Sequence, residues 1–301
     1  MFAVRYERFG GPEVLGLGEV PEPHAGPGEV RVRVEAAGVS PVDLALRAGT
    51  SPAGAGLRLP HVPGVDAAGV VDEVGAGVTG VGPGDAVFGI VPLAGLGGAS
   101  AQFAVLAHWA AKPESWAWEQ AGGAGTSVET ATRALDRLAT PDGGTLLVDG
   151  AAGGVGSVVV QLAVARGLRV LGTGRPDSAG FLAGLGAVPV AYGPGLDGRV
   201  TERVDRALDV AGKGSLPALV ALTGAPGHVL TLADFSGPVH GVALSTGELG
   251  GEPGGHHGLA AAAALAAQGR FRIPLQDVIP FARAADAHTA RPRRGKTVLV
   301  P

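Results

Sequence analysis

The feature that most constrains this fold is a glycine-rich turn that joins a short apolar strand to a helix. Thr145–Asp149 is typical of a buried strand, and Val155–Arg166 has the spacing of a helix. Between them the residues fit the pattern G-x-G-x-x-G if Ala151 takes the first position, with Gly153 and Gly156 in the other two. A strand, such a turn and a helix in this order are typical of a parallel sheet that binds a dinucleotide.

Each position of the pattern has a physical reason. The strand end needs a tight turn, where alanine can suffice. Gly153 has no Cβ, so the backbone can approach a pyrophosphate there, and Gly156 lets the helix lie close to the strand. The helix N-terminus adds N–H donors and a positive partial charge. We expect the cofactor to contact Ala151, Ala152, Gly153, Gly154, Val155 and Gly156.

The residues after about position 125 support this interpretation because apolar strands alternate with helices. Glycine makes up 53 of 301 residues, so a chance match is more frequent here and a purely structural turn is the alternative. Alternation of strands and helices nevertheless indicates a doubly wound parallel sheet. The further strands that we expect are Leu168–Gly172, Val188–Ala191, Ala207–Val210, His228–Leu232 and Val239–Leu244.

The two ends of the chain have a different pattern. Glu29–Ala36 alternates valine with charged residues, as a half-buried strand does, and glycine and proline punctuate the first 110 residues. In the tail we expect helices over 259–268 and 281–290 and a last strand, Lys296–Val300. The sequence therefore predicts an α/β protein with a β-rich domain beside the doubly wound sheet, which 301 residues suffice to build.

Charge and composition exclude several classes of protein. The formal net charge of −4 and the absence of a long basic cluster disfavour nucleic-acid binding. The chain has no cysteine, which excludes disulfides, thiolate metal sites and a cysteine nucleophile. Met1–Arg5 does not begin a signal peptide, and no apolar run reaches the length of a membrane span. We expect a soluble cytoplasmic protein with no nucleic-acid or membrane partner.

The end of the second Rossmann-type strand predicts which nicotinamide cofactor binds. An NAD enzyme usually has an acidic residue about 20 positions after the turn begins, whereas an arginine accommodates the 2′-phosphate of NADP. Here the segment contains Thr173, Gly174 and Arg175, which we expect to bind the cofactor, and Asp177 comes two residues late, after a proline. The pattern favours NADPH over NADH, with a solvated loop cation as the alternative interpretation of Arg175.

Several motifs in order along the chain give a resemblance to a known family. The sequence resembles the zinc-independent quinone oxidoreductases, the zeta-crystallin-like branch of the medium-chain dehydrogenase/reductases, over essentially its whole length. The segments that carry the resemblance are Gly38–Asp43, Pro63–Gly75, Gly82–Val87, Ala151–Ala163 and Gly295–Val300.

The resemblance implies a domain arrangement and cofactor contacts. A GroES-like catalytic domain would comprise residues 1–125 and 253–301, and a Rossmann NADPH-binding domain would comprise 126–252. A homodimer is also implied. Tyr192 would contact the adenosine 2′-phosphate together with Arg175, and Lys296 would approach the pyrophosphate, although a surface lysine at a strand start is the alternative.

The resemblance also bears on zinc. Zinc-dependent relatives have a cysteine near Ser40 and a histidine where this chain has Val65. His256 and His257 are the only adjacent histidine pair, in a glycine-rich loop. We expect no metal.

Residues near the nicotinamide are also taken from the resemblance. Ser40, which replaces the family's asparagine, and Thr130 would have a positioning role near the nicotinamide, with Thr126 and Ser127 as alternatives in the same stretch. The Ser40 hydroxyl would bind either the acceptor oxygen or the nicotinamide ribose. A turn hydroxyl before Pro41 is the alternative role for Ser40. Asp43 is expected to be a structural cap or ion-pair partner, and no general acid is assigned. From position alone, an apolar acceptor pocket is expected at Leu46, Phe88 and Leu232.

These observations favour one function and leave two others open. The leading hypothesis is an NADPH-dependent oxidoreductase that transfers a hydride to quinones or similar activated carbonyl compounds. The alternatives are an enoyl or alkenal reductase, which needs a proton source at the α-carbon, and a redox sensor that binds NADPH without turnover. The partner in the first two cases is a small-molecule quinone or enone.

Overall fold

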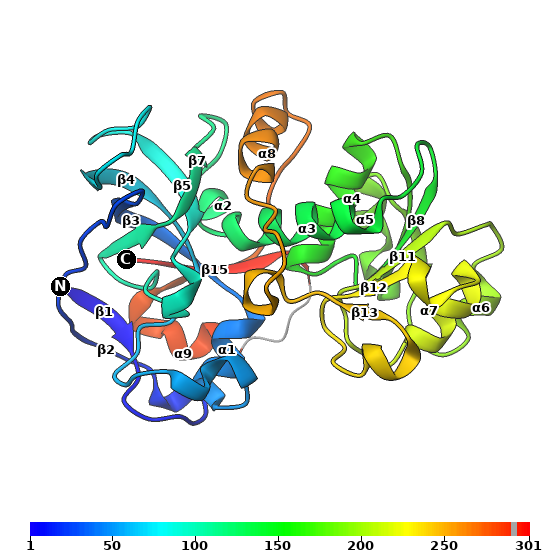
Figure 1. Cartoon of the computed structure of the whole chain (residues 1–301), viewed down its shortest axis with the longest axis horizontal. Coiled ribbons are helices and arrows are strands. Elements are labelled where there is room, and N and C mark those ends of the chain that lie inside the picture. The colour runs from blue at the N-terminus through cyan, green and yellow to red at the C-terminus, as the bar shows by residue number, and fades with distance from the viewer. Residues whose placement is uncertain (290–293) are drawn as a thin grey trace. The chain divides into compact units, whose positions relative to one another are not determined.

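The computed structural model describes residues 1–289 and 294–301, which form two compact units (Figure 1). Unit 1 contains Met1–Ser127, the described residues 256–289 and Lys296–Pro301. Unit 2 contains Val128–Gly255 with Arg294 and Gly295. The boundaries expected from the sequence, 125/126 and 252/253, fall two and three residues from these.

Unit 2 is built on a six-stranded sheet in which every neighbouring pair is parallel. The strand order is β10-β9-β8-β11-β12-β13, so the strand before the glycine turn, β8, lies inside the sheet. The strands are β8 (Thr145–Asp149), β9 (Arg169–Gly174), β10 (Val188–Ala191), β11 (Arg206–Asp209), β12 (Val229–Thr231) and β13 (Ala243–Leu244).

Helices connect these strands and cover their apolar residues. Leu147 of β8 pairs with Leu171 of β9 and Ala207 of β11, and these side chains pack with Leu216 and Leu219 in one buried cluster. The helices are α3 (Gly125–Leu138), which begins in unit 1, α4 (Gly154–Ala165), α5 (Ala179–Gly184), α6 (Leu196–Arg199) and α7 (Leu216–Thr223). The doubly wound parallel sheet predicted from the alternation is therefore confirmed.

The last expected strand of this sheet is mostly wrong. Of Val239–Leu244 only Ala243–Leu244 forms a strand, and Gly237–His240 is a turn of 3-10 helix. Pro238 at the start of that turn cannot donate to a sheet ladder, and Gly241 ends it with a φ of +69°. Val239 is consequently 85% exposed although its residue type favours a strand.

Unit 1 is β-rich, as its alternating pattern predicts. Val30, Val32 and Val34 of β3 point into the core, while Arg31 makes two hydrogen bonds to Asp72 of β4, with N–O distances of 3.0 and 2.9 Å. The main sheet has the order β14-β15-β3-β4-β5-β7, with β6 also paired to β3. Its strands are β3 (Val30–Val39), β4 (Asp66–Val74), β5 (Ala86–Ile90), β6 (Phe103–Leu106), β7 (His108–Ala111), β14 (Leu275–Pro280) and β15 (Lys296–Val300).

The smaller elements of unit 1 complete its description. β1 (Phe2–Arg5) and β2 (Gly16–Glu19) form a separate antiparallel pair. The helices are α1 (Pro41–Ala48), α2 (Trp118–Gly122), α8 (Gly258–Ala267) and α9 (Ala284–Ala287).

The tail of the chain returns to the sheet of the N-terminal residues. β15 pairs antiparallel with β3 and parallel with β14, which confirms the predicted last strand at the same residues. β14 was not expected, since Leu275–Pro280 does not alternate and its pairing has an irregularity between Leu275 and Asp277. The helix expected over 281–290 is shorter: a 3-10 turn, Phe281–Arg283, precedes α9, and residue 290 lies outside the described part.

Within residues 1–289 and 294–301, no helix combines the length and the apolar character that crossing a membrane requires.

Candidate functional site

The turn after β8 depends on a glycine that the pattern did not use. Gly150 has a φ of +90°, a conformation that side-chain-bearing residues rarely adopt. It directly follows β8, so the tight turn is made by Gly150 and not by Ala151. Ala151 is instead buried, and a Cβ on Gly172 of β9 would lie 2.9 Å from the Ala151 Cβ. The turn therefore needs glycine in β9 as well.

The two glycines of the pattern, Gly153 and Gly156, have opposite surroundings. A Cβ on Gly156 would lie 2.2 Å from the Gly150 carbonyl oxygen and 2.8 Å from the Ala151 Cα, so α4 approaches the turn too closely for any side chain. A Cβ on Gly153 would meet nothing closer than the Gly150 oxygen at 3.5 Å. Gly156 is required for packing, whereas Gly153 leaves open space above the turn.

The start of α4 has the features that a pyrophosphate needs. Helix geometry leaves the N–H groups of Gly154, Val155 and Gly156 without an acceptor inside the helix. The Gly295 N–H donates to the Ala152 carbonyl at 2.9 Å, so the chain of residues 294–295 lies beside the turn. Free N–H donors, a helix dipole and the open space at Gly153 together fit a dinucleotide phosphate.

A buried polar network supports the turn from the sheet side. Asp149 at the end of β8 accepts hydrogen bonds from the hydroxyls of Thr173 and Ser215, the latter at 2.6 Å. The Thr173 hydroxyl also accepts the Gly150 N–H at 3.0 Å. Thr173 is fully buried, so its hydroxyl orients the turn, and we assign it that role in place of the expected side-chain contact with the cofactor.

Two arginines lie near the end of β9, where the sequence suggested only Arg175. The Arg175 guanidinium lies 3.4 Å from the exposed carboxylate of Asp177, and Arg294 lies 3.7 Å from the same carboxylate. Arg294 also donates to the Asp177 carbonyl oxygen. Arg294 follows the turn by some 140 residues, so counting along the sequence from the turn could not find it. Tyr192 is 55% exposed after β10, and its N–H donates to the Gly174 carbonyl.

In unit 1, Ser40 begins α1 and is held through its backbone by a buried carboxylate. The Ser40 N–H donates to Asp43 Oδ2 at 2.7 Å, and the Gly64 N–H donates to Asp43 Oδ1 at 3.0 Å. Asp43 is 1% exposed. Burial raises the pKa of Asp43 to about 7, against the lowering effect of the two backbone donors; nearby Asp66 raises it further. Asp43 therefore acts as a structural cap whose charge changes near neutral pH.

The Ser40 hydroxyl belongs to a second buried cluster. The Lys296 ammonium donates to Ser40 Oγ at 2.7 Å and forms an ion pair with Asp66 Oδ2 at 3.0 Å. Thr126 gives its hydroxyl to the same Asp66 oxygen at 2.8 Å and its N–H to Oδ1 at 2.5 Å. Lys296 is 5% exposed and Asp66 is fully buried. The structure thus brings together Ser40 and Lys296, two residues that the sequence assigned to different roles.

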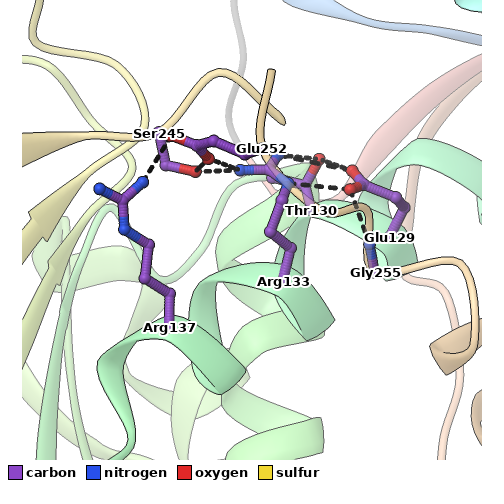
Figure 2. Close-up of polar contacts among 7 residues, drawn as sticks. All are labelled: Glu129, Thr130, Arg133, Arg137, Ser245, Glu252 and Gly255. Carbon is purple, nitrogen blue, oxygen red and sulfur yellow. Dashed lines mark hydrogen bonds and ion pairs between the residues drawn. The ribbon is translucent and has the colours of Figure 1, made fainter. Parts of the chain in front are cut away.

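Thr130 takes part in a network within unit 2 (Figure 2). Its hydroxyl donates to Glu129 Oε2 at 2.9 Å, while Glu129 Oε1 accepts the Gly255 N–H at 3.0 Å and the Arg133 Nε at 2.8 Å. Arg133 also donates to the Ser245 hydroxyl.

Glu252 completes this network on its other side. It accepts from Ser245 at 2.5 Å and from Arg137 at 2.5 Å, as Figure 2 shows. Two glutamates and two arginines therefore neutralise one another. They tie helix α3 to residues 245–255, and the Thr130 hydroxyl is oriented by this network.

The remaining candidates are separated by their burial. Leu46 and Phe88 are 1% and 0% exposed and belong to the core of unit 1, where Phe88 packs on Trp116 at 5.3 Å between ring centroids. In this structure they are therefore not pocket walls, whereas Leu232 in unit 2 is half-buried. The Ser127 hydroxyl is buried with no hydrogen-bond partner among the described residues.

Two further groups, the His256 ring and the Tyr6 hydroxyl, lie within unit 1. The ring of His256, from the adjacent histidine pair, stacks on that of His108, with centroids 3.5 Å apart and planes at 8°. Tyr6 is 1% exposed, and burial raises the pKa of its hydroxyl to about 12, so it is a poor proton donor.

The opposite surroundings of Gly153 and Gly156 predict opposite effects of the same substitution. Gly156→Ala forces α4 away from the turn and should lower the stability of the fold by roughly 1–3 kcal/mol. Gly153→Ala has room for its methyl group and should melt within about 1 °C of the wild type. It should nevertheless weaken dinucleotide binding, because the methyl group occupies the open space. Thermal unfolding and a nucleotide titration measure both effects; a Gly153→Ala protein with unchanged affinity contradicts the expected role.

Burial of Asp43 predicts a pH dependence of stability. Because the pKa of Asp43 is about 7 in the folded chain and near 3.8 in the unfolded chain, Asp43 keeps its proton between about pH 4 and pH 7 only when the chain is folded. The Asp43 contribution to stability is therefore complete below pH 4 and is lost as pH rises to 7, by up to about 1.4 kcal/mol per pH unit. Asp43→Asn should remove this contribution in urea unfolding, measured as the difference in slope from the wild type, because buried His288, whose pKa is lowered to about 4, adds a slope of opposite sign. Asp85→Asn, which changes an exposed carboxylate that caps the Gly82 N–H at 2.8 Å, should leave the wild-type slope unchanged.

The network around Glu129 predicts that removing the Glu129 charge alone lowers stability more than removing the charges of both Glu129 and Arg133. Burial alone would raise the pKa of Glu129, but donors from Arg133 and Gly255 lower it overall, so it is ionised. Glu129→Ala leaves Arg133 buried without this partner and should cost roughly 3–5 kcal/mol of stability. Glu129→Leu with Arg133→Met should cost clearly less in chemical denaturation, and equal losses would show that the ion pair has no special role.

Two family models match the chain. The alcohol dehydrogenase GroES-like domain matches residues 26–130, and the zinc-binding dehydrogenase domain matches residues 185–299. The first lies almost wholly in unit 1. The second covers residues 185–255 of unit 2 and continues into the tail that returns to unit 1.

Individual proteins are similar over longer stretches. The quinone oxidoreductase of Rattus norvegicus is 41% identical over 182 residues, 58% of this chain and 52% of its own length, so the match spans about half of that relative. The 2-methylene-furan-3-one reductase of Solanum lycopersicum is 33% identical over 261 residues, 83% of this chain and 67% of its own length. A solved mycobacterial protein complexed with NADPH has a TM-score of 0.83 and 28% identity and covers 100% of both chains.

The predicted resemblance is therefore confirmed by both sequence and fold: the two family models, the relatives and the two larger sheets of the structure agree with a GroES-like β-rich unit and a parallel Rossmann sheet. The chain belongs to the medium-chain dehydrogenase/reductases, in their quinone oxidoreductase branch.

Proposed function

We propose that this protein is an NADPH-dependent, zinc-independent oxidoreductase that transfers a hydride to quinones or similar activated carbonyl acceptors. The observation that carries the proposal is the turn in unit 2. There, free N–H groups at the start of α4 and the open space at Gly153 occur together with two arginines, Arg175 and Arg294, that share one carboxylate.

The cofactor supplies the hydride when bound, and the residues of the chain bind and orient it. The turn residues would hold the pyrophosphate through N–H donors. Arg175 and Arg294 would bind the 2′-phosphate with charge-assisted hydrogen bonds, and Tyr192 would cover the adenosine from its exposed position after β10. Asp177 is the only carboxylate paired with these arginines among the described residues, and both arginines neutralise it.

The acceptor would be positioned by hydroxyl groups. Ser40 and Thr130 are each fixed by charged neighbours, so their hydroxyls are held in defined orientations. Reduction of a quinone needs precise positioning and little acid–base chemistry, which suits a chain without a suitable tyrosine. Zinc independence is supported by Val65, which stands where zinc-dependent relatives have a histidine. It is also supported by Ser40, near which those relatives have a cysteine and whose hydroxyl here accepts a hydrogen bond from the Lys296 ammonium.

Reduction of an activated C=C bond is the second candidate. The relative from Solanum lycopersicum, a 2-methylene-furan-3-one reductase, aligns with 83% of the chain and supports it. The homodimer and the cytoplasmic location expected from the sequence stay predictions.

Turnover distinguishes these functions. The protein is titrated with NADPH and NADH, and absorbance of the reduced nicotinamide is followed with 1,4-benzoquinone, 9,10-phenanthrenequinone and a 2-enal. Oxidation with the quinones supports the proposal, and oxidation with the 2-enal alone supports C=C reduction. Tight NADPH binding without oxidation in the presence of any acceptor supports the redox-sensor alternative. Failure to bind either nucleotide overturns the proposal.

Cofactor preference is tested by the two arginines. Arg175→Ala and Arg294→Ala should each raise the Kd for NADPH by roughly 10-fold, as expected for a charged hydrogen bond, and leave the Kd for NADH within about 2-fold. Arg203→Ala is the matched control, because Arg203 is 89% exposed and pairs with Asp205. An equal loss of both nucleotides in either variant would show that the arginine does not bind the 2′-phosphate.

A further inference from the structure

The cluster of Ser40, Asp66, Thr126 and Lys296 contains one hydroxyl proton that is not firmly bound. Asp66 Oδ2 already accepts from Lys296 at 3.0 Å and from Thr126 at 2.8 Å. The Thr126 proton is therefore committed to a carboxylate. The Ser40 hydroxyl has only two acceptors for its own proton in the described part of the chain, Asp66 and Thr126, both at 3.4 Å. At that length each is a weak hydrogen bond.

The same hydroxyl is strongly polarised by a neighbouring ammonium group. Lys296 donates to Ser40 Oγ at 2.7 Å, the length of a charge-assisted hydrogen bond. Both side chains are more than nine-tenths buried, so water does not screen this contact. An ammonium that donates into a hydroxyl oxygen makes the hydroxyl a better donor, because hydrogen bonds in a chain polarise one another.

The backbone of Ser40 is fixed as well. Its N–H is held by Asp43, and Asp43 is held in turn by the Gly64 N–H. A donor fixed at both its backbone and its oxygen needs no reorganisation when negative charge develops nearby, which is the condition for electrostatic stabilisation of a transition state.

We propose that Lys296 acts through Ser40 as an oxyanion-stabilising pair, in which the Ser40 hydroxyl donates to the acceptor oxygen that becomes negative on hydride addition. This proposal rests on the proposed function. Ser40 is the residue that touches the acceptor, and Lys296 is a positioning residue that polarises it. The buried Lys296 ammonium is engaged by Ser40 and Asp66, and the inference replaces its expected contact with the cofactor pyrophosphate.

A phenol provides a readout that does not depend on turnover. 4-Nitrophenol resembles a reduced quinone, and its phenolate absorbs visible light, so the spectrum reports the ionisation of the bound probe. The wild type should bind the phenolate more tightly than the phenol, which moves the ionisation midpoint of the bound probe to lower pH. Ser40→Ala and Lys296→Met should each move that midpoint back by about one pH unit, a 10-fold change in relative affinity.

Kinetics separate this role from cofactor binding. Lys296→Met should lower kcat with quinones by roughly 10- to 100-fold, the lower part of the range for loss of an oxyanion donor, and leave the Kd for NADPH within about 2-fold. Lys112→Met is the matched control. It removes an ammonium that lies over the Trp118 ring at 4.9 Å, outside the cluster, and should change neither the probe nor kcat.

A second variant protects the test against misfolding. Lys296→Met leaves Asp66 buried without its charge partner, and the protein can be destabilised for that reason alone. Lys296→Met with Asp66→Asn removes both charges, should fold, and should show the same shifted probe midpoint and low kcat.

The outcomes are distinct. A wild type with no preference for the phenolate, or a folded Lys296 variant that ionises the probe as the wild type does, overturns the inference. If a Lys296 variant loses NADPH affinity and the ionisation midpoint of the probe is unchanged, Lys296 binds the cofactor pyrophosphate, and the inference is wrong. Absence of NADPH oxidation by the wild type with every acceptor would instead refute the proposed function, and the probe would still report on Ser40.

Discussion

The buried ion pair between Asp66 and Lys296 is the interaction on which unit 1 depends. A fully buried carboxylate is unfavourable unless a cation and hydrogen-bond donors surround it. Asp66 begins β4, yet its cation comes from β15, 230 residues later in the chain. The buried charge of Asp66 is therefore paired by the tail that returns to this sheet and not by the N-terminal strands. Bringing together residues so far apart in sequence costs loop-closure entropy, which is offset only when the rest of the fold has formed.

Unit 2 depends on sterics in place of charge. Gly156 permits α4 to approach the Gly150 carbonyl, Gly150 supplies a positive φ, and Gly172 makes room for Ala151. These three contacts close the turn from the helix, the loop and the neighbouring strand. Gly153 has no such constraint and leaves room for a ligand. The high glycine content of this segment thus has two separate causes, close packing of protein against protein and access for a phosphate.

The sequence predicted those features whose causes are local. Alternation in β3, the apolar strand β8 and the helix after the turn all depend on neighbours within a few residues, and the structure has them at nearly the expected bounds. Features with distant causes were missed. Arg294 meets Asp177 across 117 residues, and Lys296 meets Ser40 across 256. The strand predicted at Val239 was wrong for a local reason: the 3-10 turn that contains Pro238 and ends at Gly241 includes this residue, although valine favours strands.

The polar residues of unit 1 also differ in what they can contribute to chemistry. Asp66 is neutralised by Lys296, and Thr126 gives its proton to Asp66, so both are saturated within the protein. Asp43 accepts the Ser40 N–H, and because its pKa is about 7, the strength of that hydrogen bond changes with pH near neutrality. The Ser40 side chain is held instead by Lys296. Of this set, the Ser40 hydroxyl accepts a strong hydrogen bond from Lys296, whereas the acceptors for its own proton, Asp66 and Thr126, are both weak. A site that lacks a general acid can still stabilise an oxyanion, since a polarised hydroxyl has only to donate a hydrogen bond and not to release its proton.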